Sequence, residues 1–339
     1  MDKEFMYDAL LDDELLPEEL FTSQVAQIRA KENTLLSDQD LESLMACESV
    51  QECIQMLLDK GWGPGDGVSP EELMRNEKDR CWDLLKSLCD DRQMHFFDIF
   101  RFNKDFHNLK AAIKESYVQK EVPGIYIDRG SIPVEQIRKC AADNDYSILS
   151  FPMMKAAEEA RDVLFHTGDS QLCDCIIDRA ALLEMFRIGK ESGNDLLKEY
   201  AELKCASADI NIAVRACRGG KDADFLAKAF VECDSMSVPR LITATCSGIE
   251  SVYEYLNSTA YADAVPEIQK SPAYFDKWCD DRLIKLIQPQ KYNAFTISPL
   301  LAYLLAKEIE IKSVRIILSG KINDLPEEVV RERLRVSYV

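Results

Sequence analysis

The sequence is poor in glycine, proline and histidine. Its 339 residues include 13 glycines, 12 prolines and three histidines, a composition that excludes collagen-like repeats and low-complexity linkers. His95, His107 and His166 form no His-Glu-x-x-His pair and stand beside no cysteines at ligand spacing, which is what a zinc site would need. We therefore expect structural or surface roles for these histidines, and no metal or other cofactor.

Positive charge and long apolar runs are also scarce. The 41 Lys and Arg face 60 Asp and Glu, a formal net charge of −19, and such a surface repels phosphate backbones and anionic lipid. The longest apolar run, Leu300 to Ala306, falls short of the roughly 18 to 20 residues that cross a bilayer. We expect no nucleic-acid partner and no transmembrane segment, so that any link to a membrane goes through a protein partner.

The spacing of the cysteines does not indicate a disulfide framework. Twelve of them are scattered singly, apart from Cys173-Asp174-Cys175, and the N-terminus lacks the layout of a secretory signal. A single Cys-x-Cys pair supplies at most half of a metal site. We expect reduced, intracellular thiols.

Helix signals fill most of the chain, in which 47% of the residues are apolar and 30% charged. Capping residues stand at Ser49 with Glu52, at Ser69-Pro70-Glu71-Glu72 and at Pro326, and Gly61 and Gly320 have the position of helix stops. Only Gly124 to Gly130 is short and β-rich. The pattern predicts an all-α fold of two or three packed units.

Two glycine-rich stretches could suggest nucleotide binding. Gly61 to Gly67 follows a predicted helix rather than a strand, and Gly219-Gly220-Lys221 lacks the upstream glycine and the hydroxyl residue of a phosphate loop. We interpret the first stretch as a flexible linker and expect no ATP site.

A similar cassette recurs about every 100 residues. It consists of two small or β-branched residues and a cation: Ala112-Ile113-Lys114, Ala213-Val214-Arg215 and Ser313-Val314-Arg315. Ser131-Ile132-Pro133 and Ser237-Val238-Pro239 precede the second and third cassettes, and Leu36-Ser37-Asp38 is a weaker counterpart before the first. This order of landmarks suggests three helical modules.

Each module also carries an aspartate on a predicted helix: Asp83, Asp178 and Asp281. The three cations, Lys114, Arg215 and Arg315, then have two interpretations. They pair with these aspartates across packed helices, the interpretation we favour, or they line a central socket.

The C-terminal region resembles a known family. Residues 299–321, PLLAYLLAKEIEIKSVRIILSGK, are similar to the signature of the C subunits of prokaryotic V/A-type (vacuolar-type) ATPases, the relatives of the eukaryotic V-ATPase d subunits. The resemblance continues through 322–335 to Tyr338-Val339, and weaker segments occur at 105–109 and 209–212.

The resemblance implies three helical domains, 1–118, 119–218 and 219–339, arranged as a funnel around a pseudo-threefold axis. It implies a non-catalytic rotor subunit on the cytoplasmic side of the membrane, which couples the central stalk to the proteolipid c-ring for ion transport or ATP synthesis. Its partners would be the c-ring and the stalk subunits of D and F type.

Two other classes of function remain open at this point. One is a helical-repeat scaffold that binds other partners along a concave face. The other is an all-helical enzyme using Cys246, or Glu308 with Glu310, although no supporting constellation surrounds them. The acidic runs Asp12-Asp13-Glu14 and Glu18-Glu19 are predicted to be solvated helix starts rather than partner contacts.

Overall fold

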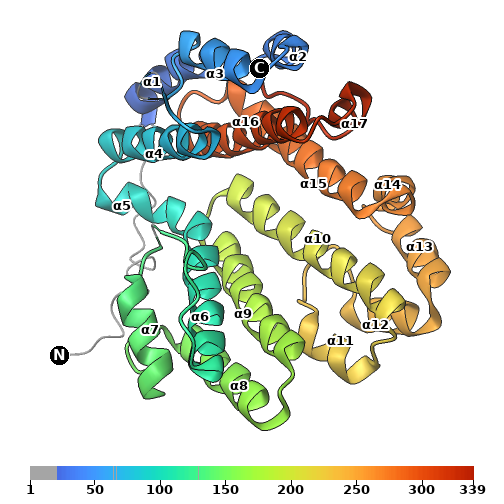
Figure 1. Ribbon diagram of the computed structural model, residues 1–339. Helices are drawn as coiled ribbons and strands as arrows, with labels where there is room; N and C mark the ends of the chain where they lie inside the picture. The colour runs from blue at the N-terminus through green and yellow to red at the C-terminus, as the bar shows by residue number, and fades with distance from the viewer. Residues whose placement is uncertain (1–20, 64, 66, 129) are drawn as a thin grey trace. The chain divides into compact units, whose positions relative to one another are not determined.

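The computed structural model describes residues 21–63, 65, 67–128 and 130–339. Throughout this part of the chain, helices are joined by turns and no strand is present (Figure 1). The predicted all-α fold is confirmed. The β-rich segment around Ile127 is held as a loop instead, because the side-chain amide of Asn108 donates to the Ile127 carbonyl and its oxygen accepts from the Ile127 amide, both at 2.8 Å.

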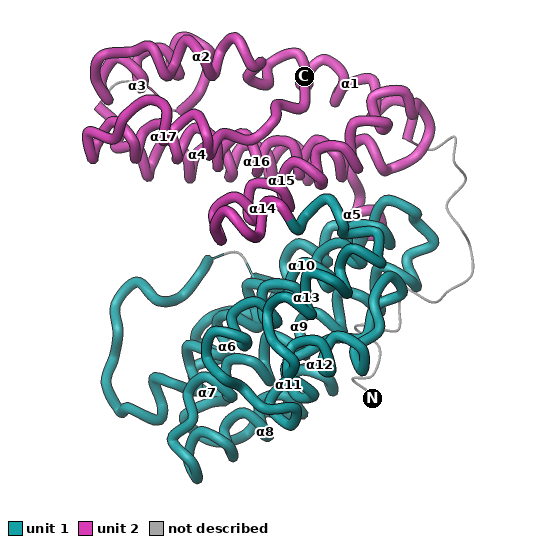
Figure 2. The backbone as a smooth tube through the Cα atoms, turned by 90° about the vertical axis from the view of Figure 1, so that its right-hand side faces the viewer, with its two compact units in different colours: residues 1–14, 95–265 teal, residues 15–94, 266–339 magenta. Residues whose placement is uncertain are grey.

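The described chain divides into two compact units (Figure 2). The first contains residues 95–265, and the second combines residues 21–94 with 266–339. The second unit therefore brings the N-terminal and C-terminal parts of the described chain into one hydrophobic core.

The first unit is a stack of antiparallel helices. Helix α9 packs against α6, α8, α10 and α11, and its apolar residues Ile177 and Met185 are completely buried. The elements are η4 (His95–Phe100), α6 (Phe102–Val118), α7 (Val134–Asp143), α8 (Phe151–Thr167), α9 (Ser170–Glu191), α10 (Asp195–Gly219), α11 (Ala223–Ala229), α12 (Val238–Ser247), α13 (Ile249–Asn257) and η5 (Ala262–Ala264).

The second unit is built around α16, which packs against α1, α2, α3 and α4 (Figure 1). Residues from Ser298 to Lys307 are all buried, as expected for a helix that is apolar on every side. The elements are α1 (Thr22–Glu32), α2 (Asp38–Ala46), α3 (Val50–Asp59), α4 (Pro70–Leu88), α5 (Asp91–Met94), α14 (Val265–Lys270, which begins at the last residue of the first unit), α15 (Pro272–Ile287), η6 (Gln288–Tyr292), α16 (Ser298–Ile322) and α17 (Glu327–Arg331).

The predicted capping residues begin helices. Ser49 accepts the Glu52 amide at 3.1 Å, and Ser69 and Glu72 form a reciprocal capping box at the start of α4, so orphan amides of the first turns are satisfied. Pro326 precedes α17. Gly61, with a φ of +85°, follows the end of α3 as predicted.

Gly320 does not end its helix, and that prediction is wrong. Helix α16 continues to Ile322. A Cβ at position 320 would lie 2.5 Å from Cγ2 of Val330, so the glycine allows close approach of α17 rather than a change in backbone direction.

The C-terminal segment is fixed within the second unit by polar contacts. Arg335 donates to Asp280 at 2.9 Å, the Val336 amide donates to Asp281 at 2.9 Å, and the Tyr338 hydroxyl donates to Glu32 at 3.0 Å. These contacts hold the last residues against helices from both ends of the sequence.

Candidate functional site

The three cassettes lie on the three long helices α6, α10 and α16. In each, the two small or β-branched residues are buried and the cation is more exposed. Each cassette therefore lies at the boundary between the buried and the exposed face of its helix.

Lys114 is ion-paired with Asp174, which is not one of the three candidate aspartates. Its Nζ lies 2.6 Å from Asp174, while Asp178 binds Lys110 at 2.8 Å. Both pairs join α6 to α9, in successive turns of each helix. The pairs are partly exposed, so each contributes about 1 kcal/mol or less.

The other two cations are placed differently. Arg215 and Arg315 are exposed, and neither forms an ion pair with any described residue. The structure therefore brings neither of them together with Asp178 or Asp281.

The two remaining candidate acids also differ from each other. Asp281 is half-buried, accepts the Val336 amide and pairs with Lys277 at 3.2 Å, so it anchors the C-terminal segment. Asp83 lies exposed on α4.

A buried charged cluster in the second unit was not predicted from the sequence. Lys307 Nζ lies 3.1 Å from Glu310 and 3.5 Å from Glu77, and it sits 5.1 Å from the centre of the Trp62 ring. The Lys307 side chain is 5% exposed. The signal that could have identified this cluster is the interruption of the apolar run 299–306 by Lys307 and Glu310, which stand on one helix face.

Part of the glycine-rich stretch 61–67, which we interpreted as a flexible linker, is packed beside this cluster instead. Trp62 is buried, the Gly63 amide donates to Glu77 at 3.3 Å, and Arg80 donates to the Gly61 carbonyl. Residues 61–63 are thus packed against α4.

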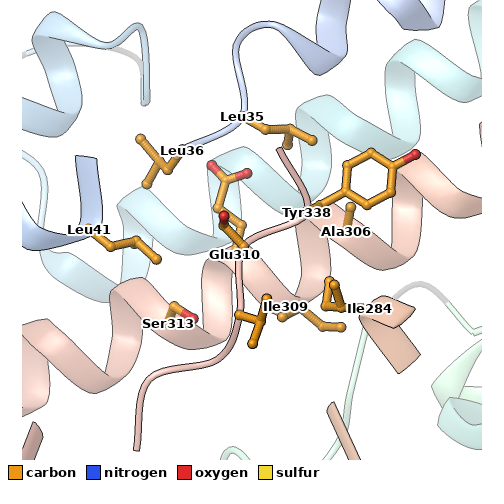
Figure 3. Close-up of a pocket in the computed structure, with 11 residues that line it drawn as sticks. Leu35, Leu36, Leu41, Ile284, Ala306, Ile309, Glu310, Ser313 and Tyr338 are labelled. Atoms are coloured by element: carbon orange, nitrogen blue, oxygen red, sulfur yellow. The ribbon is translucent and has the colours of Figure 1, made fainter. Parts of the chain in front are cut away.

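Glu310 borders a cavity of about 10 Å³, enough for about one water molecule. Figure 3 shows its carboxylate directed between Leu36 and Tyr338. Its Oε2 has no hydrogen-bond partner among the described residues. Burial raises the pKa of Glu310 to about 7, although the Lys307 ammonium opposes this rise.

The buried carboxylate of Asp105 and the half-buried carboxylate of Glu202, both on long helices of the first unit, hold loops that lead into short helices. Asp105 on α6 accepts the Ser131 amide at 3.0 Å and the Ile132 amide at 3.1 Å. Glu202 on α10 accepts the Ser235 amide at 2.8 Å. The preceding long helix therefore fixes the first Ser-x-Pro landmark itself and the segment just before the second.

A further carboxylate, Asp209 on α10, is completely buried and accepts the Val231 amide at 3.0 Å. Burial raises the pKa of Asp209 to about 8, and the bond from Val231 opposes the rise. A buried carboxylate with one backbone donor and no cation in hydrogen-bond contact is costly to ionise.

The nominated catalytic groups do not form a constellation. Glu308 pairs with Lys78 at 3.3 Å whereas Glu310 pairs with Lys307, and Cys246 is exposed. All twelve cysteines are free. Burial raises the pKa of Cys173 and of Cys175 to about 11, so these thiols are protonated and poorly nucleophilic at neutral pH.

Two negative findings for the described residues concern metals and membranes. No group of three or more His, Cys, Asp or Glu side chains in these residues has the arrangement to hold a metal ion. None of the helices in this part of the chain is both long and apolar enough to span a bilayer.

The described residues therefore form an all-helical protein in which the buried carboxylates of Asp105 and Glu77 are held by internal hydrogen bonds and ion pairs. Residues 24–333 match the model of the ATP synthase (C/AC39) subunit family. The chain belongs to this family.

Curated relatives cover nearly the whole chain. The C subunit of the V-type sodium ATPase of Enterococcus hirae is 25% identical over 320 residues, which are 92% of this chain and 97% of that protein. The C subunit of the A-type ATP synthase of Methanocaldococcus jannaschii is 23% identical over 343 residues, covering 91% of this chain and 84% of the relative. The resemblance noted in the C-terminal sequence thus extends along the fold.

Proposed function

We propose that this chain is a non-catalytic rotor subunit of a V/A-type rotary ATPase, which couples the central stalk to the membrane proteolipid ring. The observation that carries the proposal is the family match over residues 24–333. One relative is named for a sodium ATPase and others for ATP synthases, so the complex either transports ions at the expense of ATP or makes ATP. The partners would be stalk subunits of D and F type and the c-ring.

The physical chemistry of the chain supports a mechanical role. Torque transmission requires packed helices that resist bending and displacement. Helices α9 and α16 are each surrounded by other helices. Cys173 and Cys175 are protonated thiols at neutral pH, and the carboxylates of Asp105 and Glu202 are occupied by backbone amides. Such groups stabilise a scaffold. ATP hydrolysis would then take place on other subunits of the complex.

The three-module plan, with boundaries 1–118, 119–218 and 219–339 and a funnel around a pseudo-threefold axis, is part of the proposal. The repeated burial pattern of the cassettes on α6, α10 and α16 supports it. Within this plan we assign Arg215 and Arg315 to partner contacts, because both are exposed cations without ion pairs to described residues. The protein would be peripheral, on the cytoplasmic side, and held there by its partners.

An affinity-tagged chain expressed in its own host tests the proposal. Membranes are solubilised gently, and the proteins that co-elute are identified by mass spectrometry together with ATPase activity. We expect stalk subunits, proteolipid and ATPase activity in one peak. Elution of the chain alone would contradict the rotor assignment and favour the helical-repeat scaffold.

A second measurement separates coupling from catalysis. The complex is reconstituted into vesicles with and without this chain, and ATP hydrolysis and ion uptake are measured in parallel. We expect loss of ion uptake without the chain, while hydrolysis by the catalytic subunits persists. Loss of hydrolysis in proportion to uptake would argue for a catalytic role.

A further inference from the structure

The first unit contains a groove of about 400 Å³ enclosed by α8, α9 and α11. Its lining includes the small or apolar side chains of Ala156, Ile176, Leu183 and Ala227. A volume of this size lies in the range of ordinary ligand sites, and the small residues let a bound chain approach the helices closely.

The charge of the groove is opposite to that of the protein. Four cations and two acids line it, among them the buried Glu184. Arg187 donates two hydrogen bonds to Glu184, of 2.7 and 3.0 Å, and also pairs with Glu191, so it adds no free positive charge to the groove. Three cations, Lys155, Arg179 and Lys228, then remain against one carboxylate in a chain whose net charge is −19.

The two lysines are available for a ligand. Lys155 and Lys228 are exposed, and neither forms an ion pair with a described residue. Lys155 lies 5.2 Å from the centre of the ring of Phe151, which is 66% exposed beside the groove residue Pro152. The groove therefore combines an apolar floor, unneutralised cations and an exposed aromatic ring at one end, a combination that suits a segment bearing both acidic and apolar side chains.

One segment of this chain has that chemistry. Residues 1–20, MDKEFMYDALLDDELLPEEL, contain eight acids and one lysine, interspersed with aromatic and aliphatic residues. They lie outside the described residues and precede the family match, which begins at residue 24. They include the acidic runs Asp12-Asp13-Glu14 and Glu18-Glu19, whose predicted structure is therefore untested.

We propose that residues 1–20 bind in the groove of α8, α9 and α11 of the same chain. Their acids contact Lys155, Arg179 and Lys228, and their apolar side chains cover the floor. This inference is independent of the rotary-ATPase proposal, because it concerns an internal contact of the isolated chain.

Hydrogen–deuterium exchange of the full chain, followed by mass spectrometry, tests the contact. Lys155→Glu with Lys228→Glu reverses two charges at exposed positions of the groove. Lys120→Glu with Lys139→Glu makes the same change in net charge at exposed positions of the same unit outside the groove. Thermal unfolding of all three proteins checks that the fold is retained.

We expect residues 1–20 to exchange at least tenfold more slowly than an unstructured peptide in the wild type and in the Lys120/Lys139 variant. In the Lys155/Lys228 variant this protection should be lost, together with protection of peptides from α8 and α11. Protection independent of protein concentration supports binding within one chain, whereas protection that rises with concentration would point to a second copy and overturn the proposal. Unprotected residues 1–20 in the wild type, or protection that survives reversal of Lys155 and Lys228, would overturn it as well.

Discussion

Lys307 Nζ lies 3.1 Å from Oε1 of Glu310, and both side chains are buried inside the second unit. Glu77 approaches the same ammonium at 3.5 Å from α4. The lysine thus contacts two buried carboxylates on different helices. Glu77 also pairs with Arg80 at 2.7 Å, so Glu310 depends more strongly on Lys307 than Glu77 does.

We expect Lys307→Met to lower the free energy of unfolding by about 3 to 5 kcal/mol, because it leaves the buried Glu310 without its cation and removes one of the two cations beside Glu77. Denaturant unfolding followed by circular dichroism measures the loss. Lys60→Met is the matched control, since Lys60 pairs with Asp40 at a more exposed position and should cost about 1 kcal/mol or less. Equal losses in the two variants would show that the buried cluster contributes no more to the free energy of unfolding than the more exposed Lys60–Asp40 pair.

The raised pKa of Asp209 predicts that the stability of the protein depends on pH. Its pKa rises from 3.8 to about 8 on folding, so the folded state binds this proton more tightly than the unfolded chain does. The contribution of Asp209 to stability is therefore fully present below about pH 4 and is lost as the pH rises toward 8.

The Asp209→Asn variant cannot ionise, so its stability relative to the wild type should increase between pH 4 and 8, by at most about 1.4 kcal/mol per pH unit. Unfolding curves at several pH values give this difference directly. Asp224→Asn, at an exposed position of the same unit, should show no such trend. A flat difference for Asp209→Asn would mean that the carboxylate titrates normally.

Two helical glycines provide a packing test. A Cβ at Gly189 would lie 2.7 Å from the Ala201 Cβ and 2.9 Å from the Leu197 carbonyl oxygen, whereas a Cβ at Gly219 meets nothing within 4 Å. We expect Gly189→Ala to lower the free energy of unfolding by about 1 to 3 kcal/mol. Gly219→Ala should leave it unchanged or raise it by up to about 1 kcal/mol. Thermal unfolding compares the two, and a stabilised Gly189→Ala would contradict the close approach of α9 and α10.

The proposed partner contacts of Arg215 and Arg315 predict an assembly defect without a stability defect. Reversal of both charges to Glu should reduce co-purification of the stalk or ring subunits at least severalfold, with the melting temperature retained because both side chains are exposed. Lys120→Glu with Lys139→Glu is again the charge-matched control. Undiminished assembly of the Arg215/Arg315 variant would remove these residues from the proposed interface.

The sequence by itself determined the helical class and several helix starts. Ser49 and Ser69 were identifiable because a cap acts on amides two or three residues away, so its effect is local. The apolar run from Leu300 to Ala306 was recognisably too short to cross a bilayer, because the length of a run can be read directly from the sequence. The C-terminal signature likewise indicated the family before the fold was known.

Only the tertiary structure decided which partners the charged and small residues have. Lys114 pairs with Asp174, and Asp178 pairs with Lys110, because the offset between α6 and α9 depends on how the two helices pack, which the spacing along either helix does not encode. Gly320 resembled a helix stop, yet it lies under Val330 of α17. The cluster of Glu77, Lys307 and Glu310 exists because α4 and α16, separated by more than 200 residues, share one core. Local propensities act over a few residues, whereas ion pairs and close approaches depend on how distant segments pack.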